Sequence, residues 1–597
     1  MRIIKNLKPT FGLLFFSQNL LFLLLHLTFI FLLIDSIALA QAQQQPQGPS
    51  YLQFVFNATE FSPEEEYDYI IVGGGTAGCP LAATLSENHK VLVLERGGHT
   101  LEYPNLWSQE GFLTTLTQIN TYDSPAEPFT SEDGVANARG RVLGGSSAIN
   151  AGFYSRADPD FFDQSGFTWN LDLVNRSYDW VENVVVFRPQ LKNWQSSIRD
   201  GLLQANITPY NGYNLNHVIG TKIGGSTFDG LGRRHTSADL LNHARPSNVK
   251  VALHASVERI LFKTDNTHTF SSSRGGGGSG RGGGGGGSGD GSSSKKPEAI
   301  GVVYRDRIGR HHHAMVRGKG EVIICAGAIG SPQLLLLSGI GPRAYLSSWG
   351  IPVIHHLPYV GQYLYDNPRN GISIVPPLPL EHSLIQVVGI TESGTYIEAS
   401  SNIIPFTAPP RNIFLHNPGS SSLYLTVATI MEKISGPLSF GSLRLASTDV
   451  RVNPLVRFNY FSNTEDLARC VRGMRKIGEV LRTRSLEEFK FPEWFGGRDF
   501  RYVGPMLPFN QSDDGLMGEF CRRTVTTIWH YHGGCVVGKV VDGDHRVIGV
   551  DKLRIIDGST LSLSPGTNPQ ATLMMLGRYM GRRMVEERRR GDSSEDD

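Results

Sequence analysis

Three residues near the carboxyl end carry side chains that could act on a hydroxyl group. His530 and His532 lie in the segment WHYHGG, and Asn568 lies in SPGTNPQAT. A neutral imidazole can accept a hydroxyl proton near neutral pH, whereas a carboxamide can hold the oxygen without competing for that proton. Histidines between Trp, Tyr and Gly are also often packed and hydrogen-bonded without reacting, so the spacing alone leaves the role of His530 open.

A glycine-rich turn is the first element that must position such chemistry. Gly73, Gly75 and Gly78 form G-x-G-x-x-G directly after the apolar segment YDYIIV and at the start of the helical segment CPLAATLSE. In that context the glycines allow a tight turn, close approach to a pyrophosphate and close packing of helix on strand. Glu95 ends the next strand, VLVLE, where a carboxylate can accept hydrogen bonds from ribose hydroxyls. The unit predicts a dinucleotide site without separating NAD from FAD.

Two longer signatures follow this motif. They are GRVLGGSSAIN at 140–150 and GAIGSPQLLLLSGIG at 327–341. They resemble the two signatures of glucose-methanol-choline (GMC) oxidoreductases, and the resemblance runs from about Tyr67 to Met580. Phrases such as IWHYHGGC are similar to the plant branch that holds HOTHEAD-like proteins and (R)-mandelonitrile lyases.

This resemblance implies the fold class and the cofactor. The expected class is α/β (α+β overall), with a Rossmann-like FAD-binding domain and a second, substrate domain built on an antiparallel sheet. The expected cofactor is FAD. It should be held noncovalently, because the stretch NARGRVLGG lacks the histidine through which some relatives tether it.

The resemblance also implies roles for individual residues. His530 would be the catalytic base and Asn568 would aim the substrate hydroxyl, while hydride passes to the flavin. Ala399 and Ile528 would contact substrate, and Cys470 and Cys521 would form a disulfide. Together with the glycine turn, the cofactor-binding residues we predict are Gly73, Gly75, Thr76, Ala77, Gly78, Glu95, Val142, Gly145, Ser146, Ser147, Asn150, Ala151, Val257, Trp529, His530, Asp557, Gly558, Pro569 and Gln570.

Two activities are compatible with this resemblance. One is oxidation of the CH–OH group of an alcohol, with a hydroxylated fatty acid as one candidate and dioxygen or another acceptor taking the electrons. The other is hydroxynitrile cleavage, in which FAD does no redox work. The sequence departs from the lyase pattern, because Asn568 replaces a second histidine, Ile528 a tyrosine and Ala399, by gapless alignment, a cysteine. An amide cannot shuttle a proton as an imidazole can, so we expect oxidation. Retention of both His530 and Asn568 argues against a flavoprotein kept only for binding.

The amino end predicts a secreted protein. Basic residues precede an apolar stretch from about Phe11 to Ile34, and Ala38-Leu39-Ala40 supplies small residues for cleavage, which indicates a signal peptide at 1–40. The stretch approaches the length of a membrane span, so an uncleaved anchor is the alternative. Glycosylation sequons agree with an extracellular location in the apoplast or cell wall, and they lie at Asn57, Asn175, Asn206 and Asn510.

The remaining composition bounds the domains and the partners. The net charge is only +1 over 597 residues, so we do not expect nucleic acid as a partner. The run His311, His312 and His313 is interpreted as solvated, so no metal is expected. We expect FAD-binding segments at 61–154, 216–365 and 521–590 and substrate segments at 155–215 and 366–520. A Gly/Ser tract at 271–296 is interpreted as a disordered insertion.

Overall fold

A computed structural model describes residues 49–60, 66–117, 124–263, 295–406 and 423–593. The chain forms two compact units, Met1–Gln53 and Phe54–Asp597, and the fold and site described below belong to the second. The predicted signal peptide and the Gly/Ser tract up to residue 294 lie outside the described residues.

One sheet of eight strands in the described part of the chain carries the glycine turn. Its central strands pair in parallel, and a three-stranded antiparallel meander, β11 to β13, closes one side. Every residue of the two central strands, YDYIIV and VLVL, is buried, as expected for a parallel sheet covered on both faces. In spatial order the strands are β1 (Val55–Asn57), β10 (Val249–Leu253), β3 (Val91–Leu94), β2 (Tyr67–Val72), β13 (His311–Ile324), β12 (Glu298–Arg305) and β11 (Ser256–Lys263), and β28 (Leu553–Ile555) also pairs with β13.

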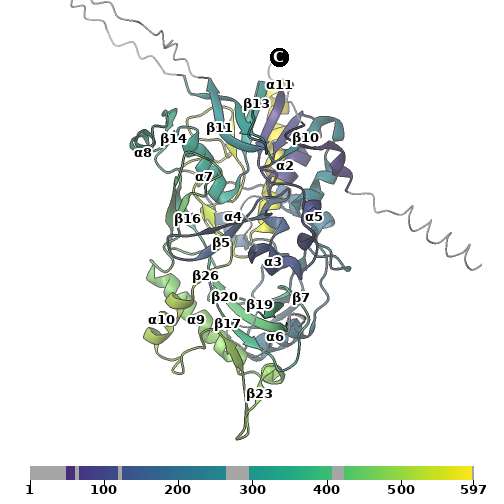
Figure 1. Cartoon of the computed structure of the whole chain (residues 1–597), viewed down its shortest axis with the longest axis vertical. Coiled ribbons are helices and arrows are strands. Elements are labelled where there is room, and N and C mark those ends of the chain that lie inside the picture. The colour runs from purple at the N-terminus through teal and green to yellow at the C-terminus, as the bar shows by residue number, and fades with distance from the viewer. Residues whose placement is uncertain (1–48, 61–65, 118–123, 264–294, 407–422, 594–597) are drawn as a thin grey trace, which may run out of the picture. The chain divides into compact units, whose positions relative to one another are not determined.

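Helices cover this first sheet and bring the chain's carboxyl end back to the glycine turn. Helix α11 (Gln570–Ser593) packs on α2 (Gly78–Leu85) and on α5 (Leu171–Val185). Helix α7 (Gly327–Leu337) follows β13 directly and packs on β11. Figure 1 shows α2, α11 and β13 together in the upper part of the view. The turn before α2 therefore meets the segment before α11.

A second sheet of eight strands in the described residues is antiparallel except for the β7–β8 pair. Figure 1 shows β17, β19 and β20 with α6 and α9 in the lower part of the view. In spatial order the strands are β25 (Arg501–Val503), β17 (Pro368–Val375), β20 (Leu423–Ile434), β19 (Thr395–Phe406), β18 (Val387–Ile390), β8 (Gly220–Ile223) and β7 (Tyr210–Tyr213), and β26 (Thr526–Thr527) also pairs with β17. The mixed first sheet and the antiparallel second sheet confirm the predicted fold class. Strand β8 lies beyond the domain boundary predicted at 215, and β26 beyond the one predicted at 520.

Side-chain alternation gives the second sheet one apolar face and one cavity face. On the apolar face, Ile372, Ile397 and Ile430 are buried in a core with Met474 and Ile477 of α9 (Thr464–Leu481). Helix α6 (Asn193–Gln204) packs on the same sheet. Helix α10 (Asp514–Thr524) packs on α9, and a disulfide joins Cys470 of α9 to Cys521 of α10, as the resemblance implied. This layer makes the sheet a rigid wall for whatever its other face binds.

A small four-stranded sheet determines where the WHYHGG segment lies. Its order is β22 (Leu455–Arg457), β21 (Gly441–Arg444), β16 (Gln362–Tyr365) and β27 (His532–Gly533). Strand β26, five residues earlier, pairs instead with β17 of the second sheet. Residues 528–531 are therefore held at both ends by different sheets, and this fixes the position of His530.

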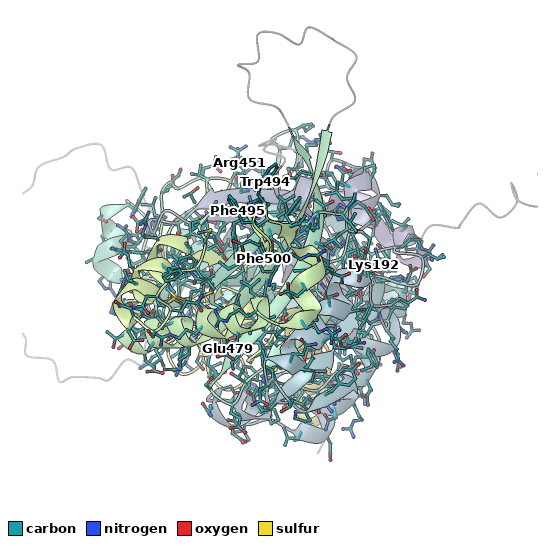
Figure 2. All side chains as sticks on the ribbon, turned by 90° about the horizontal axis from the view of Figure 1, so that it is seen from below. Lys192, Arg451, Glu479, Trp494, Phe495 and Phe500 are labelled. Carbon is teal, nitrogen blue, oxygen red and sulfur yellow. A yellow bond between two sulfur atoms is a disulfide. The ribbon has the colours of Figure 1, made fainter. Side chains whose placement is uncertain are left out.

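The other elements are short. The hairpin β23–β24 has Trp494 and Phe495 in its turn, 94% and 99% exposed, and Figure 2 shows both labelled in a view from below. The remaining helices and strands are α3 (Gly111–Thr117), α4 (Pro159–Gln164), α8 (Arg343–Ser348), β4 (Ala126–Thr130), β5 (Ala136–Gly140), β6 (Phe153–Tyr154), β9 (Gly225–Ser226), β14 (Ile340–Gly341), β15 (His355–His356), β23 (Phe491–Pro492) and β24 (Arg498–Asp499), besides short 3-10 turns.

Within the described residues, no helix is both long and apolar enough to span a membrane, and no group of three or more His, Cys, Asp or Glu side chains could hold a metal ion. His311 instead contacts Glu258, and His312 contacts Asp306. The sequon residues Asn175, Asn206 and Asn510 are exposed, and Asn57 is partly exposed.

Candidate active site

A cavity of about 1080 Å³ lies between the glycine turns of the first sheet and the free face of the second. Most of the residues predicted from the sequence line it together, although they come from segments up to about 500 positions apart. Those that line it are Gly73, Gly75, Thr76, Ala77, Glu95, Gly145, Ser146, Ser147, Asn150, Ala151, Val257, Ile528, Trp529, His530, Asp557, Gly558, Asn568, Pro569 and Gln570.

Two backbone turns, the glycine turn Gly73–Gly78 and the turn at Gly145, meet at one end of the cavity. A Cβ on Gly78 would lie 2.1 Å from the Gly73 carbonyl oxygen, and one on Gly145, whose φ is +57°, would lie 2.7 Å from Gly75 Cα. Only glycine allows both approaches. The residue before α2, Ala77, provides no side-chain cap, and the Cys79 N–H donates to the Gly75 carbonyl oxygen at 3.1 Å. The turn residues Gly75, Thr76 and Ala77, which precede the helix, line the cavity.

Two buried carboxylates hold this end in shape. Glu95 accepts hydrogen bonds from the N–H groups of Gly74 at 2.9 Å and Gly97 at 2.8 Å. Asp557 accepts them from Gly327 at 2.8 Å and from Ser559 at 2.8 Å. Burial raises the pKa of both carboxyls. Both residues line the cavity, so each supports a loop and still faces the ligand space.

His530 faces the cavity between cationic neighbours. Burial lowers the pKa of His530 well below its usual value, and the charges of Lys433, His532 and Arg369 lower it further. Its imidazole is therefore neutral at physiological pH and able to accept a proton. His532 does not line the cavity; it stacks on Tyr365 with ring centroids 5.2 Å apart, and burial lowers its pKa to about 4.

Asn568 is held from behind by a buried ion pair. Lys433 Nζ donates to Asn568 Oδ1 at 2.8 Å and to Glu398 Oε1 at 3.0 Å. Both charged side chains are 1% exposed, and the ammonium lies 4.1 Å from the centroid of the Tyr396 ring. Since an ammonium can only donate, the amide oxygen must face Lys433. The Asn568 NH₂ group is left for the cavity.

Trp529 and Arg369 form the wall next to His530. The Arg369 guanidinium lies 5.3 Å from the centroid of the Trp529 ring and donates from Nε to Thr526 Oγ1 at 3.0 Å. Trp529 has a φ of +58°, a left-handed conformation that a bulky residue rarely adopts. Such strain tends to persist at functional sites, where the surrounding structure fixes it.

The comparisons with known proteins agree with this geometry. Family models described as GMC oxidoreductase match residues 67–369 and 437–577. The chain belongs to the GMC oxidoreductase family. It is 62% identical to an (R)-mandelonitrile lyase-like protein of Arabidopsis thaliana over 91% of this chain and 94% of the relative. It is 46% identical to sinalpyl alcohol oxidase Nec3 of Nesocodon mauritianus over 95% of this chain and 99% of that relative. The fold is similar to that of pyridoxine 4-oxidase from Mesorbium loti, with a TM-score of 0.68 and 21% sequence identity. The match covers 87% of this chain and 99% of that structure.

FAD is the cofactor of this GMC protein, and the cavity fits it. The meeting glycine turns leave a backbone-lined cradle for the diphosphate, and Glu95 lies at the end of β3, where ribose hydroxyls would be bound. Asn150 and Gln570 are joined by a hydrogen bond of 2.8 Å, and both side chains line the cavity, where they would contact the polar edge of the flavin.

Three predicted residues do not line the cavity. Gly78 lies behind the turn, and Val142 is fully buried in an apolar cluster with Leu106 and Ala148. Ala399, predicted to contact substrate, is fully buried on the apolar face of β19, whereas its neighbour Ser400 lines the cavity. Neighbouring side chains in a strand point to opposite faces of the sheet, so the structure does not bring Ala399 to the cavity.

Sequence reasoning missed the ion pair and Arg369. Glu398 and Lys433 stand in strands among apolar residues, and nothing in the local pattern distinguishes them from charges on a solvated face. The pairing of β19 with β20 was the missing information, because it brings Glu398 next to Met431 and Lys433 next to Tyr396.

Proposed function

We propose that this protein oxidises the CH–OH group of an alcohol to a carbonyl, with His530 as the base and Asn568 as the donor to the hydroxyl oxygen. The observation that carries the proposal is the hydrogen bond from Lys433 to Asn568 Oδ1. It leaves Asn568 able only to donate into the cavity, and His530, neutral and cavity-lining, able to accept. To be oxidised, the hydroxyl group of an alcohol needs both a base that accepts its proton and a donor that binds its oxygen.

The two residues divide the work in a way that matches alcohol oxidation. His530 has a lowered pKa and is a weak base, so it can remove the hydroxyl proton only if the developing alkoxide is stabilised. The Asn568 N–H groups provide that stabilisation, and the Lys433 ammonium on the amide oxygen polarises them. FAD bound along the glycine turns would supply the hydride acceptor. The family membership and the alcohol oxidase among the relatives support this reading.

Hydroxynitrile cleavage makes a different demand on the site. The lyase pattern described above uses a histidine pair to move protons, and Asn568 replaces one of them. A carboxamide bonded to an ammonium cannot take up a proton. We therefore rank cleavage second, although a relative named lyase-like is 62% identical.

The decisive experiment measures both activities on the same sample. Purified holoprotein is mixed anaerobically with primary and secondary alcohols and, separately, with racemic mandelonitrile, while flavin bleaching and cyanide release are followed. Bleaching by alcohols without cyanide release supports the proposal; cyanide release without bleaching by any alcohol overturns it. His530→Ala should slow bleaching by a factor of about a hundred or more while FAD stays bound. His311→Ala, which changes a half-exposed histidine outside the cavity, is the matched control.

We also propose that the protein is secreted. The buried disulfide between two helices and the exposed sequon asparagines support passage through an oxidising, glycosylating compartment. Amino-terminal sequencing of the protein purified from whole plant tissue, and its mass before and after enzymatic removal of N-glycans, test this proposal together with a search for the protein in apoplast fluid. An intact amino terminus and an unchanged mass would count against secretion.

A further inference from the structure

The cavity face of the second sheet is ordered along its strands. Strand register places Arg369, Lys433 and Tyr396 in one row across β17, β20 and β19. The row two residues further along contains Met431, paired with Glu398. All the charged residues named on this face lie in these two rows, next to Asn568 and His530.

Two residues further along comes a row of hydroxyl groups. Ser373 pairs with Thr429, and Thr429 pairs with Ser400, so three adjacent strands each place a hydroxyl on the same level. All three residues line the cavity. Ser373 Oγ and Thr429 Oγ1 are hydrogen-bonded to each other at 2.9 Å, and this pair keeps one hydroxyl hydrogen and free lone pairs for a ligand.

Asn402 adds an acceptor just beyond this row. It lines the cavity on β19, next to Val427 of β20, and is 8% exposed. Its Oδ1 is buried and, among the described residues, has no hydrogen-bond partner. Its Nδ2 is 3.5 Å from Ser400 Oγ, at the long limit for a hydrogen bond. A buried amide oxygen without a partner is unfavourable, and a donor on a ligand would satisfy it.

We propose that this hydroxyl row and Asn402 bind a second hydroxyl group of the substrate, so that the preferred substrate is an alcohol with another hydroxyl at the far end of an apolar body. The inference rests on the proposed alcohol oxidation at His530 and names the substrate class for that site. Atoms and electrons are those of the oxidation already described, because the far hydroxyl is bound and does not react.

The spacing of the rows gives the substrate a length. Thr429 is four residues from Lys433 on one strand, which corresponds to roughly 13 Å at about 3.3 Å per residue. Between the two rows, β20 places the apolar side chain of Met431 on the cavity face. The apolar side chains of Leu384 and Ile528 also line the cavity. The ligand's middle is therefore apolar, and only its two ends form hydrogen bonds with the protein.

The far end selects a neutral group. Among the described residues, the polar side chains placed there by strand register are Ser373, Thr429, Ser400 and Asn402, which offer donors and acceptors but carry no charge. A carboxylate at that end would be desolvated without a cation, whereas a hydroxyl can donate to Asn402 Oδ1 and accept from the hydroxyl row.

Matched ligand pairs test this. The holoprotein is mixed anaerobically with α,ω-diols from butanediol to dodecanediol and with the corresponding primary alkanols, and kcat/KM for flavin bleaching is measured for each. The expected diol-to-alkanol ratio peaks at about fivefold to tenfold near octanediol to decanediol, the size of one or two net hydrogen bonds. Because a diol has two equivalent reactive ends, a ratio of about two at every chain length is the value without far-end binding, and it overturns the inference.

Variants assign the preference to the far end. Ser373→Ala with Thr429→Val, and separately Asn402→Leu, should each lower the diol-to-alkanol ratio to about two, the value set by the two equivalent ends of a diol. Thr426→Val is the matched control, because Thr426 lies on the same strand but does not line the cavity. A diol preference that survives both far-end changes contradicts the proposal.

Equilibrium dialysis separates this inference from the proposed oxidation. Oxidised holoprotein is dialysed against decanediol and decanol without turnover. Tighter binding of decanediol that is lost in Asn402→Leu supports the far-end site even if no alcohol bleaches the flavin, in which case the proposed oxidation alone fails. If alkanols bleach the flavin but decanediol and decanol bind equally tightly, the far-end site is refuted and the proposed oxidation stands.

Discussion

The Nζ atom of Lys433 donates a hydrogen bond of 2.8 Å to Oδ1 of Asn568, from a position where both Lys433 and its partner Glu398 are 1% exposed. A buried ion pair is expensive to desolvate and stabilises a fold little. Its position behind a cavity residue gives it another use, because the ammonium determines which end of the carboxamide faces the ligand. The same charge helps to keep His530 neutral.

Removing this lysine should change both rate and pH dependence. Lys433→Met alone would leave Glu398 buried without its partner, so we pair it with Glu398→Gln. The double variant should bleach about tenfold to a hundredfold more slowly, because the amide is no longer fixed and polarised. The acid limb of its rate profile should move to higher pH, since loss of a nearby cation lets the pKa of His530 rise toward its usual value.

A second buried lysine provides the control for that experiment. Lys222 is fully buried and donates to Ser155 Oγ at 2.8 Å, and burial lowers its pKa to about 7, but it is not among the charges that act on His530. Lys222→Met should leave the acid limb where it is in the wild type. A slower Lys433→Met/Glu398→Gln variant with an unmoved acid limb would limit Lys433 to a structural role.

Close packing at the glycine turn predicts a selective loss of cofactor. Gly78→Ala would bring a Cβ to 2.1 Å from the Gly73 carbonyl oxygen, so α2 must move away from the turn that forms the diphosphate cradle. We expect the purified variant to bind FAD at least tenfold more weakly, measured by flavin fluorescence on titration of the apoprotein. In contrast, Gly518→Ala in α10 meets only a contact at 3.5 Å and should raise the free energy of unfolding by about 0.5–1 kcal/mol with normal FAD binding. Equal FAD affinities in the two variants would contradict this account of the turn.

The sequence identified the local features of the site and missed the long-range ones. Gly73, Gly75 and Gly78 form a motif whose chemistry follows from contiguous residues, and the strand, turn and helix predicted around them are present. Lys433 and Arg369 acquire their roles only when β20 and β17 pair, which no local pattern encodes. Ala399 illustrates the limit most sharply: neighbouring residues of β19 face opposite sides of the sheet, so the methyl group of Ala399 lies in the core whereas Ser400 lines the cavity.

The disulfide between α9 and α10 should contribute stability and no chemistry. Cys470 and Cys521 are 51 residues apart in sequence, and closing a loop of that size restricts the unfolded chain by about 4 kcal/mol. Cys470→Ala/Cys521→Ala should lower the free energy of unfolding by about that amount in urea titrations, with unchanged flavin content. Adding dithiothreitol should lower the free energy of unfolding of the wild type to about that of the variant and leave the value for the variant unchanged. Equal stabilities without reductant would remove the bond's structural role.

A buried histidine far from the chemistry predicts part of the acid sensitivity of the fold. His545 is 2% exposed, its Nδ1 lies 3.0 Å from the Ile555 carbonyl oxygen, and burial lowers its pKa to about 4. The unfolded chain therefore binds a proton at this residue below about pH 6.5, while the folded chain does so only below about pH 4, so acid favours unfolding across that window.

Replacing this histidine by asparagine isolates its contribution. Asn tolerates the left-handed backbone at this position, where φ is +60°, and its amide can still donate to a carbonyl. The drop in the free energy of unfolding between about pH 7 and about pH 4 should be smaller in His545→Asn than in the wild type by up to about 3 kcal/mol, measured by urea titration at each pH. Because Asp366, whose pKa burial raises to about 7, titrates in the same window with the opposite sign, only the difference between the two proteins is informative. Parallel pH curves for the two proteins would mean that His545 takes up its proton equally in the folded and unfolded states.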